Sequence, residues 1–281
     1  MRESNSTVPR GAICRVQPQW SHSAFLDAVS PAYAMINLED ARRVVKRGED
    51  ADSYFPAETT VIATSTIDDD LLDIIPWESN DYRRGELDIV QGFGPDFYIP
   101  MDHSDYNDLS AEERKKRVKS VFRGSLWLDQ KLDDDDIELI PLVKGCSLEE
   151  RIYSYRLFDE LNPSIVAYYA ANYFSQGGNH VDRLLSDLET VIEEIDWPLL
   201  LIGLLSPNYL ARMPDQVVAS AGQHAWRDKV TPRQENDLAM QKTYEQLEMR
   251  VAEALGVPTR SDRSQTAPED DPQMSNQTKA E

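Results

Sequence analysis

The chain has 281 residues, of which 41% are hydrophobic and 28% are charged, so it can bury a large core. This composition excludes a wholly disordered protein, and no apolar run reaches the roughly 18 residues that a transmembrane helix requires. Fifty acidic residues against 29 basic ones give a formal charge of −21, which argues against a broad electrostatic surface for nucleic acid or anionic membrane.

Both ends of the chain are polar and lack a hydrophobic pattern. Residues 1–11 have no apolar segment of the kind found in a secretory signal, and we expect them to form a disordered arm. Residues 257–281 are rich in Ser, Pro, Gln and acidic residues, and we expect a disordered tail. We therefore predict one folded domain over residues 12–256, in a cytoplasmic protein.

Between these ends, short apolar runs alternate with segments of helical periodicity. Strands that are apolar throughout, with helices between them, are typical of a parallel sheet covered on both faces. The predicted strands are Ile13–Gln17, Ala32–Leu38, Thr59–Ser65, Phe97–Asp102, Ile137–Gly145, Ser164–Asn172, Pro198–Leu205 and Val217–Gln223.

The intervening segments have helical signals. Two of them begin with capping-box pairs, Ser110 with Glu113 and Ser147 with Glu150. A terminal helix is expected within Pro232–Leu255, where apolar residues recur at helical spacing. The other predicted helices are Glu39–Gly48, Ile67–Ile75, Asn179–Ile195 and Ser206–Met213.

Eight candidate strands ahead of one terminal helix match the number that a closed (β/α)₈ barrel needs. A doubly wound open sheet is the alternative, but no GxGxxG follows any strand to indicate a dinucleotide site. We predict an α/β protein with a single TIM-type barrel.

Active sites of such barrels lie at the carboxyl ends of the strands, and this rule selects candidate residues without further information. Asp102 and Asp105 are the candidate catalytic residues, because a carboxylate can act as a general base or accept from a ligand's donor groups. The candidate substrate-binding residues at the other strand ends are Lys144, Gly145, Asn172, Gln223 and His224.

Each of these residues also has a structural interpretation. Asp102 could cap the following loop, and Asp105 could begin a turn. Lys144 could bind phosphate or form a Schiff base, or it could pair with an acidic neighbour. Asp102, His103, Asp105 and His224 would offer mixed oxygen and nitrogen ligands to a metal, but no HxH or HExxH spacing is present.

Other polar and aromatic residues are assigned to structural roles. His22 and His180 lie in polar loop sequence and are predicted to be surface residues. The aromatic runs at residues 153–158 and 167–174 are predicted to pack in the core. Cys14 and Cys146 are far apart and are predicted to be buried thiols, with neither a disulfide nor a zinc site.

The acidic composition is accompanied by a scarcity of lysine. Only nine of the 29 basic residues are lysines, and the remainder are arginines. This pattern resembles the proteins of salt-accumulating haloarchaea, in which an acidic coat keeps proteins solvated and self-repulsion is screened within about 3 Å at molar salt. Local contacts to phosphate remain compatible with such a surface.

Three segments resemble the tRNA-guanine transglycosylase superfamily, which consists of TIM-barrel enzymes that exchange guanine for 7-deazaguanine bases in tRNA or DNA. GPDFYIPMDHSDY resembles the strand whose aspartate reads the purine edge, which implies that role for Asp102. LIPLVKGCSLEERIYSYRLFDELNPSIVAYY resembles the family's glutamine-glycine strand with its helix and next strand, Lys144 standing at the glutamine position and Gly145 being retained. LLLIGLLSPNYLARMPDQVV resembles the strand with a glycine and a Ser/Thr-Pro turn.

The chain also departs from that family. The position of the family's nucleophilic aspartate falls at residues 219–223, where no acid stands, and the zinc-binding cysteines are absent. The resemblance implies a divergent barrel that binds a purine or 7-deazapurine base in tRNA or DNA base modification, without a cofactor. The alternatives are a catalytically inert barrel with a partner or regulatory role, and a metal-assisted hydrolase.

Overall fold

We analysed a computed structural model of the chain, which describes residues 8–67, 84–105, 109–133, 135–230 and 236–259. Each of the eight predicted strands is present, although most are shorter than the apolar run that predicted them. The strands are β1 (Gly11–Val16), β2 (Tyr33–Asn37), β3 (Thr60–Thr64), β4 (Phe97–Ile99), β5 (Glu138–Leu139), β6 (Val166–Tyr169), β7 (Leu199–Ile202) and β8 (Val217–Gly222).

The strands form one parallel sheet in the cyclic order of a barrel. The order is β5-β4-β3-β2-β1-β8-β7-β6, so that the first strand lies beside the last. An isolated parallel bridge between Leu142 and Ala167 joins the segment after β5 to β6. The amide of Val143 donates to the carbonyl of Ala167 at 2.8 Å, and the amide of Ala167 donates to the carbonyl of Pro141 at 2.9 Å. The sheet is therefore curled into a TIM-type (β/α)₈ barrel, as predicted, and not an open doubly wound sheet.

The shortness of β5 has a local cause. Pro141 has no amide hydrogen and interrupts the ladder two residues after Leu139. The chain still continues along the barrel wall, because Ile140 donates to the carbonyl of Tyr98 on β4 at 2.8 Å. Closure thus depends on the bridge at Leu142 instead of on a long strand.

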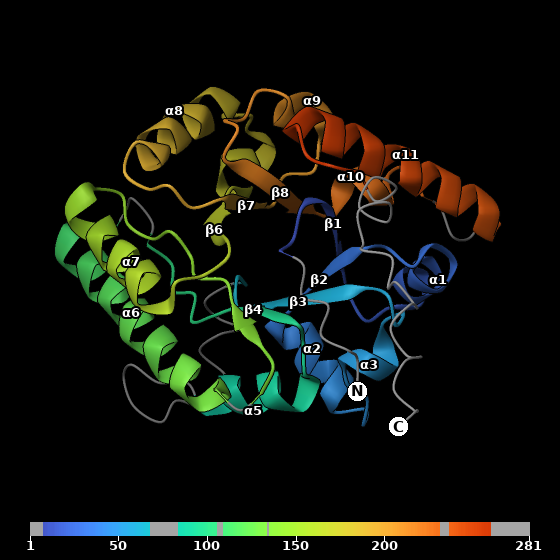
Figure 1. The fold of residues 1–281 in the computed structure, drawn as a ribbon, viewed down its shortest axis with the longest axis horizontal. Coiled ribbons are helices and arrows are strands. Elements are labelled where there is room, and N and C mark those ends of the chain that lie inside the picture. Colours follow the sequence, from blue (N-terminus) through green and yellow to red (C-terminus); the bar gives the residue numbers. More distant parts are fainter. Residues whose placement is uncertain (1–7, 68–83, 106–108, 134, 231–235, 260–281) are drawn as a thin grey trace, which may run out of the picture.

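The helices form an outer ring around the strands (Figure 1). Ser110 caps α6 by accepting from the amide of Glu113 at 3.2 Å, and the predicted capping box of Ser147 and Glu150 begins α7. The helices are α1 (Trp20–Val29), α2 (Leu38–Val45), α3 (Ala51–Tyr54), α5 (Arg84–Phe93), α6 (Ala111–Leu132), α7 (Leu148–Leu161), η1 (Ala171–Gly177), α8 (Val181–Ile192), α9 (Pro207–Leu210), α10 (His224–Arg227) and α11 (Asp237–Leu255).

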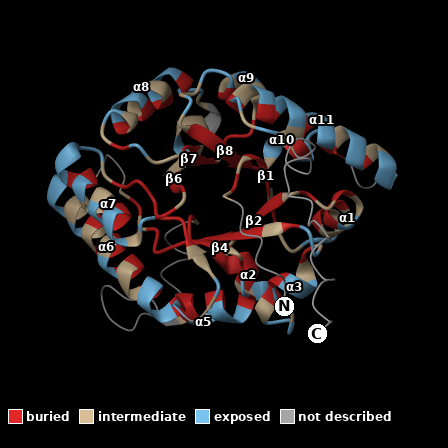
Figure 2. Ribbon diagram, viewed as in Figure 1, coloured by how far each residue is buried: buried red, intermediate tan, exposed pale blue. Residues whose placement is uncertain are grey.

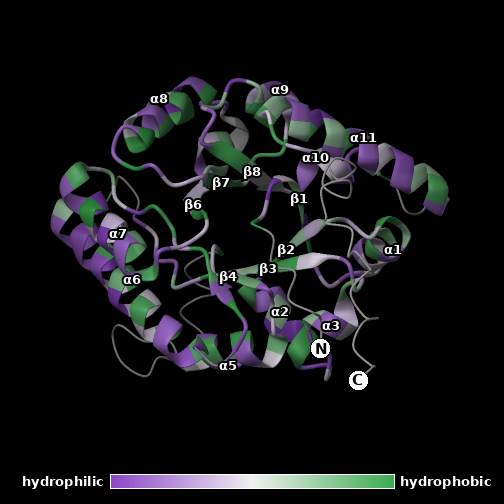
Figure 3. Cartoon of the chain, viewed as in Figure 1, coloured by the Kyte–Doolittle hydropathy of each residue, from purple (hydrophilic) through white to green (hydrophobic). Residues whose placement is uncertain are grey.

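Alternation along the strands divides the core into two layers. One buried cluster consists of strand and strand-flanking residues such as Ile13, Met35 and Ile202, and it fills the inside of the barrel. The other joins the outward strand residues to the apolar faces of the helices. Figure 2 shows buried strands at the centre, and Figure 3 shows helices with mixed hydrophobic and hydrophilic faces.

Parts of the sequence predictions lie outside the described residues. These are most of the helix predicted at Ile67–Ile75, residues 1–7 of the predicted arm and residues 260–281 of the predicted tail. Gly11, placed in the arm, belongs to β1. None of the helices in the described part of the chain combines the length and the apolar character that crossing a membrane requires.

Candidate functional site

A polar cavity of about 640 Å³ opens at the carboxyl ends of β4, β5 and β6. This volume is in the usual range for a small-molecule site, and the position is where TIM-type barrels carry their chemistry. Residues from the loops after β3, β4 and β5 form one side, and residues from β6, η1 and α8 form the other. The cavity therefore lies where the sequence rule placed a site.

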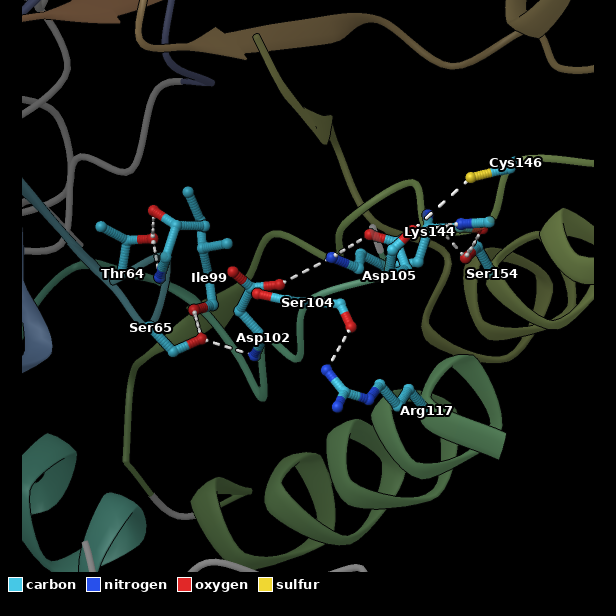
Figure 4. Close-up of polar contacts among 12 residues, drawn as sticks. Thr64, Ser65, Ile99, Asp102, Ser104, Asp105, Arg117, Lys144, Cys146 and Ser154 are labelled. Atoms are coloured by element: carbon cyan, nitrogen blue, oxygen red, sulfur yellow. Dashed lines mark hydrogen bonds and ion pairs between the residues drawn. The ribbon is translucent and has the colours of Figure 1, made fainter. Parts of the chain in front are cut away.

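The centre of the first side is a buried ion-pair cluster of one lysine and two aspartates (Figure 4). Lys144 Nζ lies 2.9 Å from Asp102 Oδ1 and 2.8 Å from Asp105 Oδ1. Burial lowers the pKa of the Lys144 ammonium, but the two carboxylates outweigh burial and raise it above its usual range. Burial raises the pKa of Asp105, whereas Lys144 and the Gly145 amide lower it, with a net decrease. Lys144 is therefore a cation here, and Asp105 an anion.

The Asp102 backbone is held against β3. Its amide donates to Ser65 Oγ at 2.8 Å, and Ser65 Oγ donates to the carbonyl of Ile99 at 3.0 Å (Figure 4). Ser65 itself is fully buried at the end of β3. Both bonds cross the junction between two neighbouring strands, so the Asp102 carboxylate has a defined position at the cavity.

A buried glutamate supports the same loop from the helix side. Glu86, in the first turn of α5, accepts from Tyr98 Oη at 2.7 Å and from the Met101 amide at 2.8 Å. Met101 has a φ of 52°, a left-handed conformation that costs energy for a residue with a side chain. Glu86 therefore fixes the turn that redirects the chain from β4 to Asp102.

Hydrogen bonds constrain the loop after β5 at Lys144 and Gly145. Lys144 donates its amide to Ser154 Oγ at 3.0 Å, and Gly145 donates its amide to Asp105 Oδ2 at 2.6 Å. Gly145 has a φ of 107°, and a Cβ there would lie 2.7 Å from Glu150 Cβ. Only glycine fits this position, because both the conformation and the space exclude a side chain.

The second side of the cavity carries a chain of hydroxyl groups. Tyr168 Oη on β6 lies 2.8 Å from Tyr173 Oη on η1, which donates to Asp187 Oδ2 on α8 at 2.6 Å. Arg183 Nε lies 3.7 Å from the same carboxylate oxygen. The lining thus combines aromatic rings and hydroxyls with a charged cluster.

The structure brings five of the seven predicted site residues together. Asp102, Asp105, Lys144, Gly145 and Asn172 line the cavity. The other two do not line it: Gln223 donates to Gln17 Oε1 at 3.2 Å, and His224 is exposed at the start of α10. β8, which precedes these two, is separated from β6 by β7, and this separation explains the split.

Three of the structural interpretations, for two single residues and one aromatic run, were wrong or incomplete. His22, predicted on the surface, is buried at 2% exposure against Trp226. Cys146, predicted as a buried thiol, is exposed and lines the cavity, whereas Cys14 is buried as predicted. The run at residues 167–174 is only partly core packing, since Tyr168, Tyr169 and Tyr173 line the cavity.

The geometry also bears on the chemical alternatives. A Schiff base requires a neutral lysine, and the paired carboxylates keep Lys144 charged. Among the described residues, no three His, Cys, Asp or Glu side chains are grouped to hold a metal ion.

Sequence reasoning missed the residues that support or face the predicted ones. Ser65 ends a predicted strand and could have been found by the strand-end rule, whereas Tyr169 lies inside the predicted strand Ser164–Asn172 and ends β6 only in the structure. Glu86 and Asp187 lie on helices, and only tertiary packing brings Glu86 under the Asp102 loop and Asp187 to the cavity. No protein-family model and no curated protein matches this chain, so the resemblance to the transglycosylases depends on its three segments alone.

Proposed function

We propose that this chain is a divergent, transglycosylase-like barrel that binds a purine or 7-deazapurine base in the cavity, in tRNA or DNA base modification. The observation that carries the proposal is Asp102, a buried carboxylate at the end of β4 that borders the cavity and is positioned by Ser65 and Lys144. A carboxylate accepts from the adjacent ring N–H and amino groups of a guanine-type base. The tyrosines of the other side supply flat surfaces against which a base stacks.

Charge within the cavity is compatible with this ligand. The acids Asp102 and Asp105 are balanced in part by Lys144, and Asp187 lies beside Arg183. A neutral base, or one attached to a phosphate backbone, thus meets less repulsion here than the overall charge of −21 implies. Asp105 is held as an acceptor by Lys144 and Gly145, so in this proposal Asp102 is the carboxylate that contacts the base.

Calorimetric titration with guanine and 7-deazaguanine at high KCl tests the proposal. We expect both bases to bind the wild-type chain, and Asp102→Asn to lose at least tenfold in affinity because one acceptor oxygen becomes a donor. Asp159→Asn, the same change at an exposed position of α7, is the matched control and keeps wild-type affinity. Absence of binding to the wild-type chain would contradict the proposal; loss in both variants would show that Asp102 has no specific role.

A further inference from the structure

The cavity extends through the barrel wall, because its lining includes neighbouring residues that face opposite sides of β6. Tyr169 packs with the cluster inside the barrel, whereas Tyr168 packs with the outer cluster between the strands and the helices. Beyond Val143 the chain turns away from β6, since the Lys144 amide donates to Ser154 Oγ on α7 at 3.0 Å. The cavity therefore has an outer compartment between α7 and α8 (Figure 1), defined by the lining residues Arg151, Tyr168, Tyr173, Asp187, Thr190 and Val191.

Arg151 joins α7 to the end of α8 in this outer compartment. Its side chain is buried, with 8% of the residue exposed. Nε and Nη2 donate to the two carboxylate oxygens of Glu194 at 2.8 and 2.6 Å, and Nε also donates to Tyr155 Oη at 3.1 Å. Glu194 lies just after α8, where its amide donates to the carbonyl of Val191 at 3.0 Å. The ion pair therefore fixes the plane of the guanidinium group.

The pair with Glu194 occupies only one edge of this guanidinium group. An arginine has five N–H groups in a planar fork, so Nη1 and the second hydrogen of Nη2 form another edge. Within the part of the chain that the structure describes, no acceptor contacts Nη1 of Arg151. A buried N–H group without an acceptor is unfavourable, so the acceptor for this edge comes from the cavity, as water or as a ligand.

We propose that Arg151 forms a second binding subsite, which holds an anionic oxygen group of a ligand, a carboxylate or a phosphate, in the outer compartment. The remaining edge of the guanidinium matches two oxygens of such a group with two parallel hydrogen bonds. Glu194 does not prevent this, because Lys144 in the same cavity pairs with two carboxylates, 2.9 Å from Asp102 and 2.8 Å from Asp105. The subsite does not depend on a base at Asp102.

The charges of the outer compartment are compatible with an anion. The hydrogen bond to Glu194 is the main cause that raises the pKa of Arg151, so its charge is kept. Burial is the main cause that raises the pKa of Tyr168 to about 12, so this hydroxyl adds no negative charge at neutral pH. The Asp187 carboxylate has a cation beside it, since Arg183 Nε lies 3.7 Å from its Oδ2.

Binding of inorganic phosphate and of acetate tests the subsite, by calorimetry and by thermal unfolding, with chloride at the same ionic strength as the reference. We expect saturable binding of at least one of the two anions to the wild-type chain, and an unfolding temperature that rises with its concentration. Arg151→Gln should lose at least about tenfold in affinity, because the charged donor edge is gone. Glu194→Gln should bind about threefold more tightly, because it removes a competing negative charge and keeps Arg151.

Arg156→Gln is the matched control, since Arg156 is an exposed arginine of the same helix, and it should keep wild-type affinity. No saturable binding to the wild-type chain, or equal affinity in Arg151→Gln, would overturn the subsite. Weaker binding in both Arg151→Gln and Glu194→Gln would also overturn it, because a purely structural ion pair acts in the same direction from either partner. If Arg151→Gln does not fold, the sign of the change in Glu194→Gln decides alone.

The same proteins separate this inference from the proposed function. Asp102→Asn should leave the affinity for the anion unchanged within about twofold, because Asp102 belongs to the barrel mouth and not to the outer compartment. Anion binding that persists when guanine does not bind would overturn the base site alone. Guanine binding without anion binding would overturn the Arg151 subsite alone.

Discussion

Lys144 Nζ lies 2.9 Å from Asp102 Oδ1, although the two residues are 42 positions apart in the sequence. The contact arises because β4 and β5 are parallel neighbours, with Phe97 beside Glu138 and Tyr98 beside Leu139. Their carboxyl ends, and the loops after them, are therefore adjacent. Asp105 adds a second carboxylate to the same ammonium, so that one buried lysine pairs with a buried and a half-buried aspartate.

Replacing the lysine should expose how much of the domain's stability depends on this cluster. Lys144→Met leaves the buried Asp102 and the half-buried Asp105 without this counter-charge, and we expect the free energy of unfolding to fall by about 3–5 kcal/mol. Urea denaturation at neutral pH measures this change in the free energy of unfolding. Lys116→Met, an exposed position of α6, is the control and should change stability by less than about 0.5 kcal/mol. Equal stability of the two variants would contradict a buried ion-pair role.

His22 should make stability depend on pH. Burial, with a smaller effect of Arg227, lowers its pKa to about 4, and its Nδ1 accepts from the Gln17 amide at 2.8 Å. Between pH 4 and about 6.5 the unfolded chain binds this proton and the folded chain does not, so stability falls as pH decreases through that window. The full effect is about 3 kcal/mol.

The measurement is the free energy of unfolding from urea titrations at several pH values between 4 and 7. His22→Gln should flatten the slope in that interval relative to the wild-type chain. His180→Gln, the same substitution at an exposed residue, should retain the wild-type slope. A steep slope that persists in His22→Gln would assign the effect to other groups.

Glu86 should control the local stability of the loop that carries Asp102. In Glu86→Ala the buried Tyr98 hydroxyl and Met101 amide lose this acceptor, and we expect the free energy of unfolding to fall by about 2–4 kcal/mol. Amide hydrogen exchange at Met101 and Asp102 should accelerate more than exchange in α11, which lies elsewhere in the fold. Glu86→Gln retains one acceptor oxygen and should be affected less; indistinguishable Ala and Gln variants would argue against the hydrogen-bonding role.

Gly145 should tolerate no side chain, in contrast to another glycine of positive φ. Gly145→Ala places a Cβ 2.7 Å from Glu150 Cβ and 2.8 Å from the Arg151 nitrogen, so the backbone must move and the bond to Asp105 weakens. We expect a loss of at least about 3 kcal/mol in unfolding free energy. Gly48→Ala, with a φ of 79° and no atom within 4 Å of the added Cβ, should lose only about 1 kcal/mol. Thermal unfolding of both variants compares them directly.

The sequence alone was sufficient for the architecture. Continuous apolar runs such as that of β3, and capping signals such as Ser147, are local features of the sequence. A strand that is apolar on both faces is typical of a parallel sheet with both faces covered, so these local features predict the architecture. Asp102, Asp105, Lys144, Gly145 and Asn172, which the strand-end rule selected, line one cavity, because parallel strands that lie side by side end at one edge.

Tertiary structure decided the rest. Which strand ends share a cavity depends on their order around the barrel, and this order puts Gln223 and His224 outside it. Part of the cavity lining comes from Tyr173 and Asp187, whose hydrogen bond joins η1 to α8 across 14 positions. Which helix lies beside the cavity and which way a hydroxyl donates result from packing between elements, and no periodicity along the chain encodes them. Strands, helices and caps are set by residues within a few positions of one another.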